Sequence, residues 1–133
     1  GMRIFDGRCH VDAYDGYEAA EIGYRLLVSE GSKAEETSLF VYYHGNGEVC
    51  AEYTGWADVY AKFPCTFLVF DYRAYGWSTG EPDIGCLTKD PEVCMCQLPH
   101  ILRRHGLAWP WAGPTVLMGR SLGVAVATSL IGK

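Results

Sequence analysis

Thr115-Val116-Leu117-Met118-Gly119-Arg120-Ser121-Leu122-Gly123 is the stretch that decides the fold of this chain. A short apolar run leads into a Gly-x-Ser-x-Gly motif, and residues 124–131 behind it are mostly small and apolar. The pattern predicts a strand, a tight turn and a helix. Such a turn pushes one serine hydroxyl out beyond the end of a sheet, and the glycines let the backbone close around it. Ser121 is therefore a candidate nucleophile, and the alternative is a turn serine that caps the next helix.

The residues after this motif lack the partners of a catalytic serine. Residues 124–133 contain no His, Asp or Glu, although a serine hydrolase built on such a turn takes its acid and its histidine from later in the chain. His44 belongs to another motif, and we expect His100 and His105 to be exposed or satisfied by local hydrogen bonds. The sequence thus contains a candidate nucleophile without the acid and the histidine that would activate it, so we expect this chain alone to be inactive.

Composition sets the broad class of the protein. With 133 residues, 49% of them hydrophobic and 20% charged, the chain suits one soluble globular domain over residues 1–133. A net charge of −5 gives no reason to expect nucleic acid as a partner. No apolar run approaches the roughly 18 residues of a membrane span. Gly1 before Met2 resembles the scar of a removed tag, and no signal peptide follows it, which favours the cytoplasm.

The spacing of the cysteines suggests neither disulfides nor a metal. Cys94 and Cys96 form a C-x-C pair with no Cys-x-x-Cys or paired histidines elsewhere. With no secretory signal, we expect the six cysteines to be free buried thiols, and we expect no metal and no cofactor.

Hydrophobic periodicity predicts alternating strands and helices. Strands are expected over residues 22–28, 38–43, 65–70 and 115–118. Helices are expected over residues 49–63, over residues 90–105 with a kink or restart at Pro99, and after Ser121. Asp90 suits the N-cap of the second helix and Gly106 its end. Alternation of this kind favours the α/β class, with a mostly parallel sheet covered on both faces in a three-layer sandwich.

His44-Gly45-Asn46-Gly47 follows the expected strand over residues 38–43. A serine acyl-transfer site needs two backbone N–H groups that point at the developing oxyanion. Leu122, the residue after the candidate nucleophile, would supply one of them, and Asn46 the other. A plain Gly-rich turn is the simplest alternative. Another is a dinucleotide-binding fingerprint, Gly-x-Gly-x-x-Cys, with Asp71 as the ribose-binding acid, although Cys50 would crowd the position that needs Gly or Ala.

Three motifs occur in register, and together they resemble the α/β hydrolases. They are His-Gly-Asn-Gly at 44–47, Asp-Tyr-Arg-x-Tyr-Gly-x-Ser at 71–78 and Gly-Arg-Ser-Leu-Gly at 119–123. The resemblance covers about residues 22–131 and is nearest to the serine-peptidase-like and lysophospholipase-like branch, which includes thioesterases acting on acylated proteins. One departure is Ala74, where that branch usually has Gly, so a positive φ there would add strain.

The resemblance implies a fold and a set of roles. The fold would be the N-terminal half of an α/β hydrolase, a single incomplete domain that ends just after the helix that follows Ser121. Asp71 and Arg73 would shape a loop, although a solvated surface pair is equally compatible with the sequence. The implied site consists of Ser121 as nucleophile, Asn46 and Leu122 as backbone oxyanion donors, and a supporting loop of His44, Gly45, Gly47, Gly119, Arg120 and Gly123.

The expected function is hydrolysis of ester, thioester or peptide bonds by the complete form, on a small-molecule or acylated substrate. A non-catalytic, hydrolase-like binding module and a Rossmann-like dinucleotide-binding module are the alternatives. The strand over residues 115–118 would lie in mid-sheet in the family, and here its outer neighbours are missing. Its open edge favours pairing with a second copy of the chain or with a missing C-terminal half. The sequence does not identify the substrate.

Overall fold

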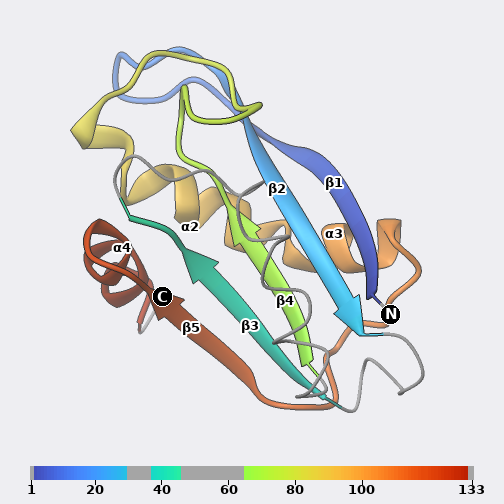
Figure 1. The fold of residues 1–133 in the computed structure, drawn as a ribbon. Helices are drawn as coiled ribbons and strands as arrows, with labels where there is room; N and C mark the ends of the chain where they lie inside the picture. Colours follow the sequence, from blue (N-terminus) through green and yellow to red (C-terminus); the bar gives the residue numbers. More distant parts are fainter. Residues whose placement is uncertain (1, 30–36, 46–64, 132–133) are drawn as a thin grey trace.

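A computed structural model describes residues 2–29, 37–45 and 65–131. Its strands are β1 (Met2–Val11), β2 (Ala20–Ser29), β3 (Ser38–Tyr43), β4 (Cys65–Phe70) and β5 (Thr115–Gly119), and they form one sheet in the order β1-β2-β4-β3-β5. Strands β3, β4 and β5 are parallel, whereas β2 is antiparallel to β4 and to β1 (Figure 1). The α/β class is confirmed, and the sheet is mixed because the N-terminal hairpin adds two antiparallel pairings.

One face of the sheet carries the main core. The alternating apolar residues of β2 that predicted a strand, Ile22, Tyr24, Leu26 and Val28, are all buried on this face. The helices α2 (Lys89–Cys96), α3 (Leu98–Arg104) and α4 (Leu122–Ser129) pack against it. Their buried contacts are Cys94, Leu98, Ile101, Leu102, Val126, Ala127 and Leu130. This packing places the start of α4 beside the ends of β3 and β5.

The opposite face of the sheet holds a smaller buried cluster of Leu27, Phe67 and Val69, with Phe40, Tyr42 and Trp77 packed against it. Strand β4 contributes to both clusters and is buried along its whole length, as its continuous apolar run predicts. The helix expected over residues 49–63 lies outside the described residues. The structure therefore describes the helical layer on one face.

The helical region between β4 and β5 differs from expectation at its start. Pro99 coincides with the predicted restart, because α2 ends at Cys96 and α3 begins at Leu98. Gly106, at φ 81°, follows the end of α3 as expected. The N-cap of α2, however, is Thr88 and not Asp90, which lies inside the helix. Asp90 is instead buried and binds Arg73, an interaction that nothing local in the sequence reveals.

Strand β1 is a strand for which the sequence analysis makes no prediction. Its exposed Asp6 and Arg8 lie on the face opposite Phe5 and Cys9, in the period of two that is typical of a strand. Pairing with β2 over the whole length of β1 defines the strand. Asp6 lies opposite Arg25 in the register and accepts hydrogen bonds from its Nε and Nη2 at 2.6 and 2.7 Å. Pairing with β2 therefore sets the register of this edge strand.

Candidate active site

Ser121 occupies a strained turn between β5 and α4. Its backbone has φ 54° and ψ −115°, a region that residues with a side chain rarely adopt and that costs about 1–3 kcal/mol. Its side chain is exposed and makes no capping hydrogen bond to α4, although the residue stands at the N-cap position. The predicted strand, turn and helix are thus present, and the serine hydroxyl does not cap the helix.

Gly119 and Gly123 make this turn sterically possible. A Cβ on Gly119 would overlap the carbonyl group of Gly123, and a Cβ on Gly123 would overlap the carbonyl group of Tyr43. The backbone of α4 therefore lies directly against the end of β3. Since any side chain would separate these segments, the two glycines of the motif fix the serine at the carboxyl edge of the parallel strands.

The loop after β3 lies beside this turn. The N–H of Arg120 donates to the carbonyl of Tyr43 at 3.1 Å, so the two segments are hydrogen-bonded just where each strand ends. The next residues, His44 and Gly45, are buried. Two of the three predicted motifs therefore meet at one edge of the sheet, as the parallel order of β3 and β5 requires.

His44 is held rigidly at the start of this loop. Its side chain is fully buried, with Nε2 at 2.9 Å from Asp71 Oδ1 and Nδ1 at 2.9 Å from the carbonyl oxygen of Gly45. The hydroxyl of Tyr72 donates to the carbonyl of His44 at 2.6 Å. Asp71 and Tyr72 both come from the segment after β4. This segment thus fixes the position of the loop from which an oxyanion donor is expected.

The segment after β4 is fixed in turn by a buried ion pair. Arg73 donates from Nε and Nη2 to the two carboxylate oxygens of Asp90 at 2.9 and 3.0 Å, and both residues are buried. The hydroxyl of Tyr14 also donates to Asp90, at 2.9 Å. Burial, followed by contact with Cys86 and Asp90, raises the pKa of Tyr14 well above its ordinary value. The alternative of Asp71 and Arg73 as a solvated surface pair is therefore wrong.

Ala74 has the positive φ that its place in the motif suggested. Its φ is 72°, and Gly76 follows at 55°. A Cβ on Gly76 would overlap the Asp71 carboxylate, so this glycine allows the segment to fold back on its own aspartate. The positive φ of Ala74 costs about 1–2 kcal/mol in strain.

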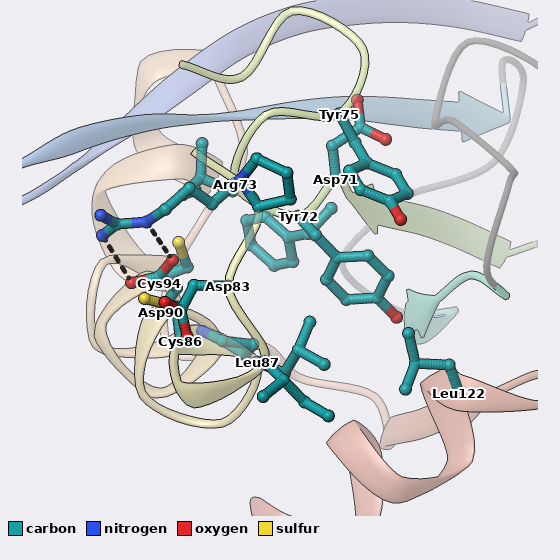
Figure 2. A pocket seen from close by; sticks show the side chains of 15 residues that line it. Asp71, Tyr72, Arg73, Tyr75, Asp83, Cys86, Leu87, Asp90, Cys94 and Leu122 are labelled. Atoms are coloured by element: carbon teal, nitrogen blue, oxygen red, sulfur yellow. Dashed lines mark hydrogen bonds and ion pairs between the residues drawn. The ribbon is translucent and has the colours of Figure 1, made fainter. Parts of the chain in front are cut away.

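A cavity of about 370 Å³ lies between the segment after β4, α2 and the first residue of α4. Its wall includes Phe70, Tyr72, Leu87, Cys94 and Leu122 (Figure 2). Leu122 is the residue directly after Ser121, and Tyr72 binds the loop that carries His44. The cavity therefore borders the candidate site, although sequence patterns gave no sign of it.

Other predicted site residues have mixed outcomes. Leu122 begins α4 and is half-buried, and Arg120 is exposed. Asn46 and Gly47 lie outside the described residues, as does Cys50 of the dinucleotide fingerprint. Asp71 is buried against His44 and is not free to bind a ribose, which argues against the dinucleotide alternative.

The remaining histidines and cysteines do not form a second site within the described residues. His105 lies near Tyr24, with Nε2 at 2.8 Å from the Tyr24 hydroxyl, and its ring stacks on Phe5. Of the described cysteines, all are free thiols; Cys9, Cys65, Cys86 and Cys94 are buried and Cys96 is exposed. Among the same residues, no cluster of His, Cys, Asp or Glu suits a metal ion. None of the helices described is both long and apolar enough to cross a membrane.

Solved structures with a similar fold are hydrolases. A protein of Agrobacterium vitis S4 classed as a hydrolase matches with a TM-score of 0.69 at 20% identity, over 97% of this chain and 45% of its own. A mutant of the rice cell wall degrading esterase LipA from Xanthomonas oryzae matches with a TM-score of 0.72 at 18% identity, over 97% of this chain and 37% of its own. The Aspergillus niger epoxide hydrolase matches with a TM-score of 0.57 at 15% identity, over 92% of this chain and 29% of its own.

No protein-family profile matches the sequence. The chain spans less than half of the length of each of the three structures above. The match covers 92–97% of this chain at TM-scores of 0.57–0.72, so the likeness is one of fold. The chain therefore has the α/β-hydrolase fold, in the part that extends from the N-terminal hairpin to the helix after β5.

Proposed function

We propose that this chain carries the nucleophile and the oxyanion donors of a serine hydrolase that acts on ester, thioester or peptide bonds. The observation that carries the proposal is the backbone of Ser121, at φ 54° and ψ −115°, between β5 and α4. Such strain persists only where the surrounding structure imposes it, and it clusters at functional sites. Here it exposes one hydroxyl at the carboxyl edge of the parallel strands.

Each residue of the site has a role in this proposal. Ser121 attacks the carbonyl carbon of the substrate, and a base accepts its proton, so that a tetrahedral oxyanion forms and then collapses to an acyl-enzyme. Leu122 is the first residue of α4, and its N–H is one of those at a helix start that have no acceptor within the helix. That N–H and the N–H of Asn46 stabilise the oxyanion. His44, Asp71 and Tyr72 position the second donor.

The base is the missing part. His44 is fully buried and bound to Asp71, and His105 is bound near Tyr24, so both of these histidines have partners other than Ser121. The chain alone is then expected to hydrolyse p-nitrophenyl acetate weakly. Loss of a working catalytic triad lowers kcat by about 10⁶-fold. Substrate binding and the oxyanion hole alone still accelerate the reaction by about 10³–10⁴-fold over the uncatalysed reaction in water.

Covalent labelling tests the proposal directly. The purified chain is incubated with an alkyl fluorophosphonate, with and without imidazole in the buffer as a substitute base, and the labelled peptide is identified by mass spectrometry. We expect an adduct on Ser121 that forms faster with imidazole and is absent in Ser121→Ala. Ser129, which donates to the carbonyl of Val126 in the same helix, is the internal control. Equal labelling of Ser121 and Ser129, or none with imidazole present, contradicts the proposal.

A further inference from the structure

The cavity beside Leu122 has the size and surface of a binding site for an apolar chain. Its volume of about 370 Å³ falls within the range of about 300–1,000 Å³ that small-molecule sites occupy. Ile22, Phe70, Leu87 and Leu122 contribute apolar side chains to its wall. An apolar ligand that fills such a space gains free energy from every methylene that leaves water.

The charged groups of the wall are already engaged, which excludes recognition of an ionic ligand by a free charge there. Among the described residues that line the cavity, Arg73 is the one basic residue, and it holds both oxygens of Asp90. The other acidic side chains also have partners within the chain: Asp71 binds His44, and Asp83 accepts from the N–H of Gly85 at 2.7 Å. What remains available to a ligand in this cavity is mostly apolar surface.

The cavity extends from exposed residues to Leu122, the residue next to the candidate nucleophile. At one end its wall is formed by Pro82, Asp83 and Ile84, which are exposed, and the side chain of Ile84 is 85% exposed. At the other end its wall is Leu122, whose N–H belongs to the proposed oxyanion hole and whose neighbour is Ser121. Figure 2 shows Leu122 at the start of α4, across the cavity from Cys86 and Asp90, with Leu87 between them.

We propose that this cavity binds the acyl chain of the substrate, so that the enzyme favours esters or thioesters of apolar acids of medium length over acetyl esters. The inference rests on the proposed function, because an acyl chain here has its carbonyl beside Leu122 and Ser121. The pocket belongs to the chain's own β4–α2 segment and to α4. Leu87, at the middle of the cavity, sets the length of chain that fits.

Binding is measured first, without any reaction. N-methyl octanamide and N-methyl acetamide are neutral, unreactive analogues, and calorimetric titration of each into the chain compares a long with a short acyl group. We expect N-methyl octanamide to bind and N-methyl acetamide not to bind. Leu87→Trp, which fills the cavity, weakens octanamide binding by about tenfold or more, since several methylenes lose their contacts. Val124→Trp places the same side chain on the exposed face of α4 and leaves binding unchanged.

Labelling of Ser121 then separates this inference from the proposed function. We expect octyl fluorophosphonate to react faster than ethyl fluorophosphonate, Leu87→Trp to remove this preference, and Val124→Trp to leave it unchanged. Octanamide binding without any labelling would support acyl-chain binding in the cavity and contradict Ser121 as the nucleophile. Labelling of Ser121 with neither octanamide binding nor a preference for the octyl reagent would support Ser121 as the nucleophile and contradict acyl-chain binding in the cavity. Circular dichroism checks the fold of Leu87→Trp, and Leu87→Phe replaces it if it does not fold.

Discussion

At the residue scale, two of the three described non-glycine residues with positive φ differ in what their strain does. Ser121 and Ala74 both have positive φ values, 54° and 72°. The strain at Ser121 presents a hydroxyl at the candidate site. The strain at Ala74 presents only a methyl group, and that side chain is exposed. Because the strained residue Ala74 carries no functional group, replacing it should stabilise the chain without loss of a functional side chain.

Ala74→Gly is therefore expected to stabilise the chain. Glycine adopts positive φ without the clash that costs other residues about 1–2 kcal/mol, and it loses about 0.4–1 kcal/mol through greater freedom in the unfolded state. The free energy of unfolding should rise by about 0.5–1 kcal/mol in urea titrations. Ala112→Gly is the control, because Ala112 is exposed and has no positive φ, so the same change there should destabilise. Loss of stability in Ala74→Gly would contradict the strain.

His105 makes stability depend on pH. Burial, and then the charge of Arg104, lowers its pKa below the ordinary value of about 6.5. The unfolded chain therefore binds a proton more readily than the folded one, and stability falls as the pH drops through that value. Arg104 Nη1 donates to the Tyr24 hydroxyl at 3.2 Å, which leaves that hydroxyl to donate to a neutral His105.

His105→Gln should remove this part of the pH dependence. Urea titrations of wild type and variant, above and below a pH of about 6.5, give the difference in unfolding free energy. We expect wild type to lose more stability than His105→Gln on acidification. His10, whose pKa is raised first by its hydrogen bond with Glu21 and then by that with Asp12, acts in the opposite direction and is present in both proteins. Equal losses would show that His105 is not the source.

At the scale of elements, two Arg–carboxylate pairs of similar geometry differ in burial. The pair of Arg73 and Asp90 joins the segment after β4 to α2 in the interior. The pair of Arg25 and Asp6 joins β1 to β2 at the surface, and the Asp6 side chain is 44% exposed. Breaking a buried pair leaves an uncompensated charge away from water, whereas a surface pair is replaced by water.

Asp90→Ala should thus cost far more stability than Asp6→Ala. We expect losses of about 3–5 kcal/mol for the buried pair and at most about 1 kcal/mol for the surface pair, measured by denaturant unfolding. Asp90→Ala should also slow the labelling of Ser121, because the segment that holds His44 loses its anchor. Similar losses in the two variants would show that the buried pair does not fix this segment.

At the scale of the whole molecule, the two edges of the sheet differ in how they meet water. Within the described residues, β1 is paired with β2 alone and β5 with β3 alone. Strand β1 carries Arg3, Asp6 and Arg8, and charged side chains discourage further strand pairing. Strand β5 has no charged residue, and Met118 and the nearby Val124 of α4 are 39% and 51% exposed.

The β5 edge is therefore expected to join two copies of the chain. Sedimentation at micromolar concentration should show a dimer or a larger assembly, and Met118→Lys should shift it towards monomer. Ile4→Lys, at a 42% exposed position on the opposite edge, is the matched control and should leave the assembly unchanged. A wild-type chain that sediments as a monomer contradicts this expectation.

Local patterns in the sequence were enough to predict the central strands and the helix after Ser121. Strands β2, β3, β4 and β5 and the helix after Ser121 coincide with or contain the predicted ranges, since their apolar residues follow the period of one buried face or form continuous runs. The motif at Gly119–Gly123 also predicted the strand, turn and helix, because glycines at those positions admit a backbone that other residues would block.

Only the tertiary structure decided which groups meet. The register of β1, the buried pair of Arg73 and Asp90, the hydrogen bond from Tyr72 to the His44 loop and the cavity beside Leu122 all join segments that are distant in sequence. Asp90 illustrates the reason: the local pattern favours a helix cap, and a buried guanidinium 17 positions earlier in the chain claims the carboxylate instead. Local preferences are worth about 1 kcal/mol, and a buried charge without its partner costs several times more, so long-range pairing prevails.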